Sequence, residues 1–408
     1  MSVNGLGRPR ILVLNQYYWP GVEATAHLLT ELCEALAEEY DVEVITGALH
    51  GHEDEPASGE RNGVRIVRVA STAYERSQLG RRAANYFSYL GSALGHSLRG
   101  PRPDLVLCMT DPPIIGDLGV AVGRRFDAPV LVISQDVFPE IATELGRLRN
   151  PAVVGVLGAL VGAYLRRADR IVAIGETMRE RLEAKGAPPE RVRVIPNWVD
   201  TRAITPQPRD NEWATKHDLA SRFVVMHSGN VGHAQDLDSL VRSVTFLRDL
   251  DELRVVIAGF GARHAEMVEL SRRLDVDDRV RFFPYQPRER LPLSLASADL
   301  HVVGLAKGLA GYVVPSRLYG ILAAGRPVIA AAEGTSETAR LVSEVGCGVV
   351  IDPGSPELLA RTIRAATEGV FDLAEMGRRG REYVEREADR AVAMRRYRAL
   401  VAELVNGA

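Results

Sequence analysis

The sequence predicts an α/β protein with two Rossmann-like domains, each built on a parallel sheet. Short apolar runs, typical of buried parallel strands, alternate with amphipathic helical stretches along most of the chain. This alternation stops at the Pro-rich and charged segment 205–210 and then starts again. The chain has 408 residues, which exceeds one ordinary core and suits two domains of roughly 200 residues.

The first half begins with a strand at 10–15, a loop, and an amphipathic helix over about 25–39. Further strands are expected at 42–46, 63–69, 105–109, 130–133, 170–174 and 192–195. Because helical stretches separate most of these strands, the predicted sheet is parallel and covered on both faces.

The second half repeats this pattern after residue 205. Its strands are expected at 223–227, 253–258, 280–283, 300–303 and 327–330. A long helix over about 374–404 follows. We therefore divide the chain into domains 1–204 and 205–385 and a C-terminal helix 386–408. A ligand is expected where the strands of both sheets end.

Composition and charge narrow the functional class. Hydrophobic residues make up 46% of the chain and charged residues 25%, as in soluble globular proteins. A net charge of −3 gives no general attraction to nucleic acid, so no nucleic-acid partner is expected. The three cysteines lack metal or disulfide spacing, and the polar N-terminus lacks a secretory signal. These features indicate a cytoplasmic protein.

The segment 227–232, His-Ser-Gly-Asn-Val-Gly, follows a strand and precedes a helix. Gly229 and Gly232 would let the backbone curl around Asn230 and present N–H groups to a phosphate. A plain strand-to-helix turn is the alternative interpretation of this segment.

The segment 313–330 predicts a loop, a short helix of small and apolar residues, and a buried strand. Ser316, Arg317 and the free N–H groups at the start of the helix would form an anion site. A buried helix entering a parallel sheet is the structural alternative.

A nicotinamide cofactor is not expected, although Gly259-Phe-Gly261 ends a strand. Position 264 is His where the dinucleotide fingerprint has Gly, and Arg279 stands where an acid would bind ribose. No other cofactor is expected.

Four further segments carry a family resemblance: 194–200 (Val-Ile-Pro-Asn-Trp-Val-Asp), 280–287, 332–338 and the helix near the C-terminus. With 229–232 and 313–330, they resemble the retaining glycosyltransferases of family 4. The Pro-Ser-Arg-Leu-Tyr-Gly sequence resembles a branch that builds bacterial surface polysaccharides. The resemblance implies the GT-B fold, with two Rossmann-like domains whose parallel sheets face an interdomain cleft. It also implies that the C-terminal helix crosses back to the first domain.

On the donor side, the resemblance implies roles for individual residues. Gly259, Tyr285, Gln286 and Tyr319 would contact the nucleotide base or ribose. Glu337 would be a catalytic residue, the acid that approaches the donor.

Departures from the family pattern also lie on the donor side. Tyr312 and Gly320 occupy the positions of two glutamates, and Asn230 and Gln235 those of a basic pair on the diphosphate. We therefore expect Arg317 and Lys307 to supply the positive charge. A solvated position for Lys307 is equally compatible with the sequence.

In the first half, the segment 134–140 resembles the family's His-Asp-x-x-Pro-Glu, with Gln135 in place of the His. Asp136 and Glu140 are the expected catalytic residues, although Asp136 could instead cap the next helix. The loop 19–25 corresponds to the family's first glycine-rich loop. Its residues Gly21, Glu23 and Thr25 would approach the donor sugar and acceptor.

The implied activity is transfer of a hexosyl or N-acetylhexosaminyl group from a nucleotide sugar such as a UDP-sugar, with retention. No metal is required on this account, because Asp236 and Asp238 begin a helix and are interpreted as capping residues. The acceptor would be a saccharide or lipid-linked saccharide, with peripheral membrane contact through the Arg- and aromatic-rich stretch 76–99 and the apolar segment 152–165. A nucleotide-sugar 2-epimerase and a catalytically silent sugar-nucleotide-binding subunit remain alternatives.

Overall fold

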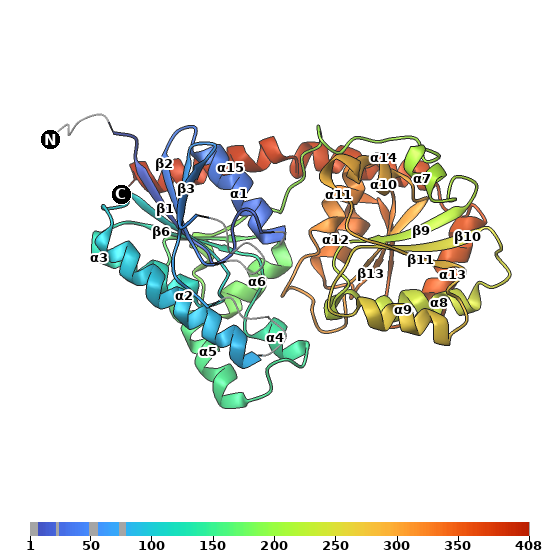
Figure 1. Ribbon diagram of the computed structural model, residues 1–408, viewed down its shortest axis with the longest axis horizontal. Coiled ribbons are helices and arrows are strands. Elements are labelled where there is room, and N and C mark those ends of the chain that lie inside the picture. The colour runs from blue at the N-terminus through green and yellow to red at the C-terminus, as the bar shows by residue number, and fades with distance from the viewer. Residues whose placement is uncertain (1–6, 22–23, 49–55, 73–78, 408) are drawn as a thin grey trace. The chain divides into compact units, whose positions relative to one another are not determined.

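The computed structural model describes residues 7–21, 24–48, 56–72 and 79–407. These residues form two compact units: 1–195 with 394–408, and 196–393. Each unit has a central sheet with helices on both faces (Figure 1). The second unit is described throughout.

In the described part of the first unit, the strands form one eight-stranded sheet in the order β3-β4-β2-β1-β5-β6-β7-β8. The strands are β1 (Arg10–Leu14), β2 (Asp41–Thr46), β3 (Ser58–Arg61), β4 (Val64–Arg68), β5 (Leu105–Met109), β6 (Val130–Ser134), β7 (Arg170–Ala173) and β8 (Val192–Val194). All of the pairs are parallel except β3 with β4. The strand β3 was not predicted because its sequence is Ser-Gly-Glu-Arg, which has no apolar run.

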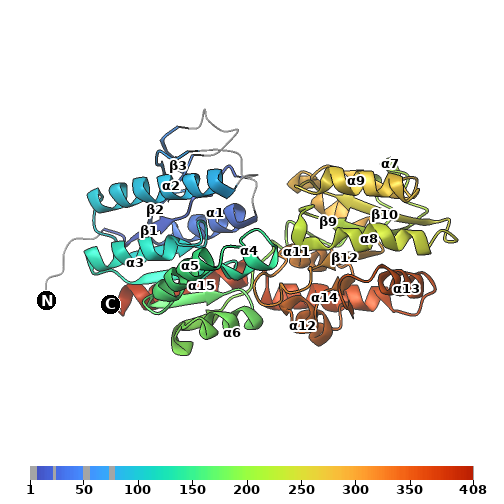
Figure 2. The same cartoon turned by 90° about the horizontal axis from the view of Figure 1, so that it is seen from below.

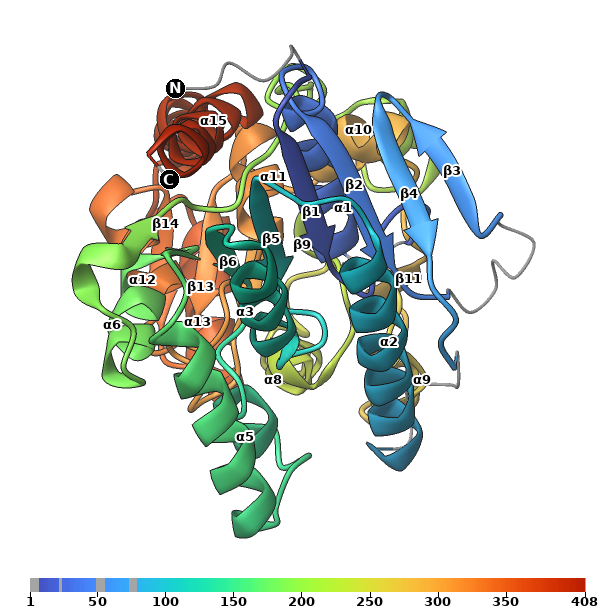
Figure 3. The same cartoon turned by 90° about the vertical axis from the view of Figure 1, so that its left-hand side faces the viewer.

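Helices cover both faces of this sheet. They are α1 (Ala24–Leu36), α2 (Leu79–Arg99), α3 (Ile115–Phe126), α4 (Glu140–Glu144), α5 (Pro151–Leu165) and α6 (Glu176–Ala184). Figure 3 shows α2 and α3 in front of the strands and α1 behind them. On the α1 side, α15 (Arg390–Asn406) packs against α1 through Arg398, which donates to Ala35 O at 2.8 Å. This helix starts in the second unit, and its residues from 394 onward belong to the first.

The sheet of the second unit is entirely parallel, in the order β11-β10-β9-β12-β13-β14. The strands are β9 (Phe223–Ser228), β10 (Leu253–Ala258), β11 (Val280–Phe283), β12 (Leu300–Gly304), β13 (Val328–Ala331) and β14 (Gly348–Ile351). Five of them match the predicted strands. The sixth, β14, was not predicted because its apolar run begins with glycine.

The helices of this unit are α7 (Glu212–Lys216), α8 (Leu237–Ser243), α9 (His264–Arg273), α10 (Leu291–Ala296), α11 (Arg317–Ala323), α12 (Glu337–Val345), α13 (Pro356–Thr367) and α14 (Leu373–Glu387). Short 3-10 helices occur at Pro189–Arg191 in the first unit and at His233–Gln235, Val244–Phe246 and Arg288–Arg290 in the second. Figure 2 shows α8 and α9, and α12 and α14, around the strands.

The segment 196–204 belongs to the second unit because it is bonded to the end of α14. Val199 N donates to Ala388 O at 3.0 Å, and Arg390 N donates to Val199 O at 2.9 Å. Thr201 Oγ1 also donates to the Asp389 carboxylate at 2.5 Å. The same bonds interrupt the C-terminal helix. Instead of the single helix expected at 374–404, the chain forms α14 and α15.

Within the described ranges, no helix has both the length and the apolar character needed to cross a membrane.

Candidate functional site

The carboxyl ends of β9 and β10 meet in the second unit, and two glycines make this approach possible. Gly229 and Gly259 follow these strands and have φ angles of +136° and +151°. A Cβ atom on Gly259 would lie 1.8 Å from Gly229 O, so no side chain fits there. The loops after β9 and β10 are therefore packed directly on one another.

Because of this packing, the phosphate-binding loop expected at 229–232 differs from the prediction. Gly229 N donates to Ala258 O at 2.9 Å, and Val231 N donates to Phe260 O at 3.0 Å. Gly232 N donates to Gln235 Oε1 at 3.0 Å. In this fully described unit, only the Asn230 N–H of the four in 229–232 has no intramolecular acceptor. The loop thus offers fewer backbone donors than the glycine pattern predicted.

Arg317 joins this loop to the end of β12. A Cβ atom on Gly229 would lie 3.5 Å from Arg317 Cδ, and Arg317 Nη2 donates to Gly304 O at 2.9 Å. Its Nε is buried and has no acceptor among the described residues. The structure therefore brings together Gly229 and Arg317, as the sequence predicted, and adds Gly304.

Electrostatics around Arg317 favour an anion. Burial lowers the pKa of Arg317 to about 10, so the guanidinium is still charged at neutral pH. The nearby His227 is fully buried and donates to Asn230 O at 3.3 Å. Burial and the charge of Arg317 hold the pKa of His227 well below its usual range, so this imidazole is neutral. Arg317 has no carboxylate partner among the described residues.

Ser316 and Lys307 flank Arg317 in sequence. Ser316 directly precedes α11, is half-buried, and does not cap the helix through its side chain. Lys307 is exposed in the loop after β12 and forms no ion pair with a described residue. Both residues are accessible to a ligand, and Arg317, which is also half-buried, packs against Gly229.

Aromatic side chains gather beside the loop after β10. Tyr285 is exposed, and its hydroxyl donates to Phe260 O at 3.1 Å. Phe260 exposes 61% of its surface and stacks on His264, with ring centroids 5.0 Å apart. Gln286 accepts from Trp213 Nε1 at 2.9 Å, so its side chain is held within the loop. Phe260 and His264 were missed; a large aromatic between two glycines at a strand end was the available signal.

Tyr319 and Glu337 differ from the expectation. Tyr319 is 1% exposed and packs in the apolar core around α11, so it is not available to a nucleotide. Glu337 begins α12, is 6% exposed, and pairs with Arg340 at 2.5 Å. Gly320 points toward Leu295 and Ile204, both at ordinary contact distance from an added Cβ.

In the first unit, polar residues gather where β1, β5 and β6 end. Asp111 N donates to Asn15 Oδ1 at 3.2 Å, and Thr25 Oγ1 donates to Asp111 Oδ2 at 3.3 Å. Gln135 N donates to Thr110 Oγ1 at 3.0 Å, which ties the loop that carries Asp136 to the same edge. Asp136 is half-buried there. Asp111 was missed, although an acid directly after a buried strand was a usable signal.

The other expected residues of this unit have mixed outcomes. Glu140 begins α4, and its carboxylate accepts from Lys185 Nζ at 2.6 Å, so its charge is compensated. Gly21 is buried in a turn, where its N–H donates to Tyr18 O at 2.9 Å. Glu23 lies outside the described residues.

Asp236 and Asp238 are held by protein groups. Asp236 Oδ2 accepts from Gly354 N at 2.7 Å, and Oδ1 accepts from Ser239 Oγ at 2.9 Å. Asp238 pairs with Arg263. The part of the chain that the structure describes contains no cluster of His, Cys, Asp or Glu suited to a metal ion.

Comparison with known families gives the class of the protein. Residues 23–198 match the family model of the glycosyl transferase 4-like domain, and residues 210–383 match that of glycosyl transferases group 1. The chain belongs to the glycosyltransferases that combine these two domains.

Individual relatives agree with this class. The probable glycosyltransferase WbjE of Pseudomonas aeruginosa is 24% identical over 412 residues, which cover 97% of this chain and 98% of the relative. The putative colanic acid biosynthesis glycosyl transferase WcaI of Escherichia coli K12 is 28% identical over 256 residues, or 62% of this chain and 61% of the relative.

Solved structures show the same GT-B fold. Anabaena Alr3699/HepE in complex with UDP superposes with a TM-score of 0.75 at 14% identity, covering 97% of this chain and all (100%) of that one. WaaG, a glycosyltransferase involved in lipopolysaccharide biosynthesis, superposes with a TM-score of 0.71 at 15% identity, covering 98% and 100%.

Proposed function

We propose that this glycosyltransferase moves a hexosyl or N-acetylhexosaminyl group from a UDP-sugar to a saccharide hydroxyl, with retention, during assembly of a cell-surface polysaccharide. The observation that carries the proposal is Arg317, a half-buried arginine whose buried Nε has no acceptor and which has no carboxylate partner among the described residues, beside Gly229 at the strand ends. A charge that is partly removed from water and has no partner is unfavourable, and a bound diphosphate would compensate it. The names of WbjE and WcaI and the UDP complex of HepE support the substrate class.

Arg317 would act on the leaving group. As the bond between the anomeric carbon and the diphosphate oxygen breaks, negative charge builds on that oxygen, and the guanidinium stabilises it. The acceptor hydroxyl forms the new bond on the same face and passes its proton to the departing phosphate oxygen, which gives retention. The Asn230 N–H, Ser316 and Lys307 would add donors around the phosphates. No metal and no cofactor is required on this account.

The aromatic residues after β10 and β11 would hold the nucleotide base. Phe260 and Tyr285 are both more than half exposed and are linked through the Tyr285 hydroxyl. An exposed aromatic ring can stack on a nucleotide base whatever hydrogen-bond donors and acceptors that base carries.

In the first unit, Asp136, Asp111 and Thr25 would bind the acceptor. Their oxygen atoms lie at the carboxyl edge of a parallel sheet, where ligands of such folds bind. Asp136 would orient the attacking hydroxyl, whereas Glu140 is engaged by Lys185.

A lipid-linked acceptor at the cytoplasmic face of the membrane is supported by α5. Val153, Val156 and Leu160 expose 42%, 62% and 36% of their surfaces on this helix, which contains no charged residue. Figures 1 and 3 show α5 projecting from the rest of its unit. Exposed Arg147 and Arg149 precede it, and Arg166 and Arg167 follow. Apolar side chains flanked by arginines suit insertion into the headgroup region of an anionic bilayer. In the stretch 76–99, Phe87 is 66% exposed, whereas the side chains of Arg76, Arg81 and Arg82 lie outside the described part of the chain.

A nucleotide-sugar screen tests the proposal. The melting temperature should rise with UDP and one or more UDP-sugars, because ligand at about 100 times its Kd adds about 2.7 kcal/mol of stability. The stabilising sugar should then be transferred, in excess EDTA, to a saccharide acceptor with retained anomeric configuration. Conversion of the nucleotide sugar to its 2-epimer without an acceptor would favour the isomerase, and binding without any turnover the silent subunit. If no nucleoside diphosphate stabilises the protein, the proposal is wrong.

A further inference from the structure

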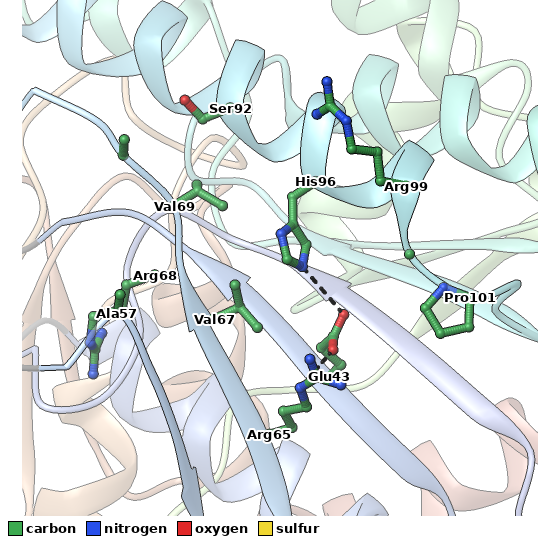
Figure 4. Close-up of a pocket in the computed structure, with 12 residues that line it drawn as sticks. Glu43, Ala57, Arg65, Val67, Arg68, Val69, Ser92, His96, Arg99 and Pro101 are labelled. Carbon is green, nitrogen blue, oxygen red and sulfur yellow. Dashed lines mark ion pairs between the residues drawn. The ribbon is translucent and has the colours of Figure 1, made fainter.

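A cavity lies in the first unit, between the last turns of α2 and the strands β2 and β4 (Figure 4). Its volume is about 630 Å³. Val67 of β4 and Val69, which directly follows β4, supply an apolar wall, and Glu43 of β2 lies at the base. His96 and Arg99 line it from α2. A volume of this size is typical of small-molecule sites.

The cavity carries an excess of positive charge. Glu43 is 3% exposed and is the only acid that lines it among the described residues. Arg10 Nη2 and Arg65 Nε lie 2.8 and 3.1 Å from the Glu43 carboxylate oxygens. His96 Nε2 is also 4.0 Å from this carboxylate. One carboxylate is thus shared among three basic side chains, and Arg99 adds a further cation.

Hydrogen-bond donors remain available at the cavity. Arg65 contacts Glu43 through Nε, and no described residue accepts from its two terminal amino groups. Arg99 donates from Nη1 to Gly95 O at 2.8 Å, which leaves Nη2 without a described acceptor. Arg65 comes from β4 and lies beside Glu43, whereas Arg99 comes from α2 and its guanidinium is turned along that helix toward Gly95 O (Figure 4).

We propose that this cavity binds the phosphate group of a phosphomonoester. A phosphate monoester carries close to two negative charges and three acceptor oxygens, which match several basic side chains on different elements. A carboxylate would be satisfied by a single arginine fork. The rest of the ligand would lie on Val67 and Val69, because a phosphate alone would fill only part of the cavity.

This site is separate from the proposed donor site. Its lining residues fall between 43 and 101 in the first unit, whereas Arg317 and Gly229 belong to the second. The inference does not rest on the identity of the donor, and substitution of Arg317 distinguishes the two sites.

Calorimetric titration with glycerol 3-phosphate at low ionic strength tests the proposal, with sedimentation on phosphatidylcholine vesicles that contain phosphatidic acid as a second arm. The soluble probe and the lipid share the phosphomonoester, so the two arms distinguish a soluble ligand from a headgroup. The double variant R65Q/R99Q should weaken binding at least tenfold in whichever arm the wild type binds. R124Q, which changes an exposed arginine outside the cavity, and R317Q should bind like the wild type.

The variant Glu43→Gln should change the affinity for the ligand in the opposite direction. Removing the negative charge should release Arg10 and Arg65 for the ligand and strengthen binding several-fold, an effect that simple damage to the fold would not produce. The proposal fails if the wild type binds neither probe, if R65Q/R99Q binds as tightly as the wild type, or if a folded E43Q binds more weakly.

Discussion

Arg317 and Gly229 meet where β9 and β12 end in the second unit. A side chain at position 229 would contact Arg317 Cδ at 3.5 Å, and the guanidinium is anchored on Gly304 O at 2.9 Å. The short helix α11 begins at Arg317 and thereby fixes this cation beside the glycine loop. The contact joins the two sequence segments, 227–232 and 313–330, that carried the strongest signals for anion binding.

Gly259→Ala should destabilise the second unit. The new Cβ would lie 1.8 Å from Gly229 O, and the residue has a φ of +151°, so overpacking and backbone strain add to about 2–4 kcal/mol. Chemical denaturation measures this loss. Gly334→Ala is the matched control, because no atom lies within 4 Å of its Cβ position. Equal stability of the two variants would show that the loops after β9 and β10 are not packed as described.

His301 should make stability depend on pH. It is fully buried, its Nε2–H donates to Leu295 O at 2.9 Å, and burial lowers its pKa from 6.5 to about 4. Between these values the unfolded chain binds a proton that the folded chain does not, so stability falls as pH falls. The loss approaches about 1.4 kcal/mol per pH unit.

Denaturation at a series of pH values checks this, and His301→Gln should flatten the profile between pH 6.5 and 4. A variant with an unchanged slope would assign the acid sensitivity to other groups, of which the equally buried His227 is the first candidate.

Asp136→Asn should reduce turnover by about 100-fold, because a small misplacement of the attacking hydroxyl can have an effect of this size. Affinity for the nucleotide should be unchanged, because Asp136 lies in the first unit. Glu140→Gln should have a smaller effect, since that carboxylate is paired with Lys185 at 2.6 Å. Initial-rate kinetics on both variants measure the difference. The reverse order of effects would transfer the acceptor role to Glu140.

Val156→Asp should weaken binding to anionic liposomes about tenfold, because a charge replaces an apolar side chain that is 62% exposed on α5. Val370→Asp is the matched control, since Val370 is 65% exposed but lies in the second unit. Vesicle sedimentation at low salt measures both. Equal binding of the two variants would show that α5 does not take part in membrane contact.

The sequence predicted most of the strands from short apolar runs bounded by polar loops. It missed β3, which is polar, and β14, whose apolar run begins with glycine. It also predicted one C-terminal helix, because the break at Asp389 arises from bonds to Val199 and Thr201, nearly 190 residues away in the chain. Long-range backbone pairing leaves no local signal in the sequence.

The predictions for the site residues also succeeded where the signal was local and failed where a long-range contact decides the structure. The approach of Gly229 to Arg317 followed from two recognisable segments. The sequence did not predict that the Gly229 and Val231 N–H groups are bonded within the unit, because this bonding depends on the contact with the loop after β10. Tyr319 looked accessible from its helix start, but it is on the face of α11 that packs into the core.

The most direct test of the central claim is the affinity of wild type and Arg317→Gln for uridine, UMP and UDP, measured by calorimetry. Arg361→Gln, an exposed arginine of the same unit, is the control. The proposed phosphate contact predicts that R317Q loses about 1.5–3 kcal/mol of UDP affinity, one to two orders of magnitude in Kd, while uridine binding is unchanged. A folded R317Q that binds UDP as tightly as the wild type would contradict the assignment of Arg317 to the donor diphosphate.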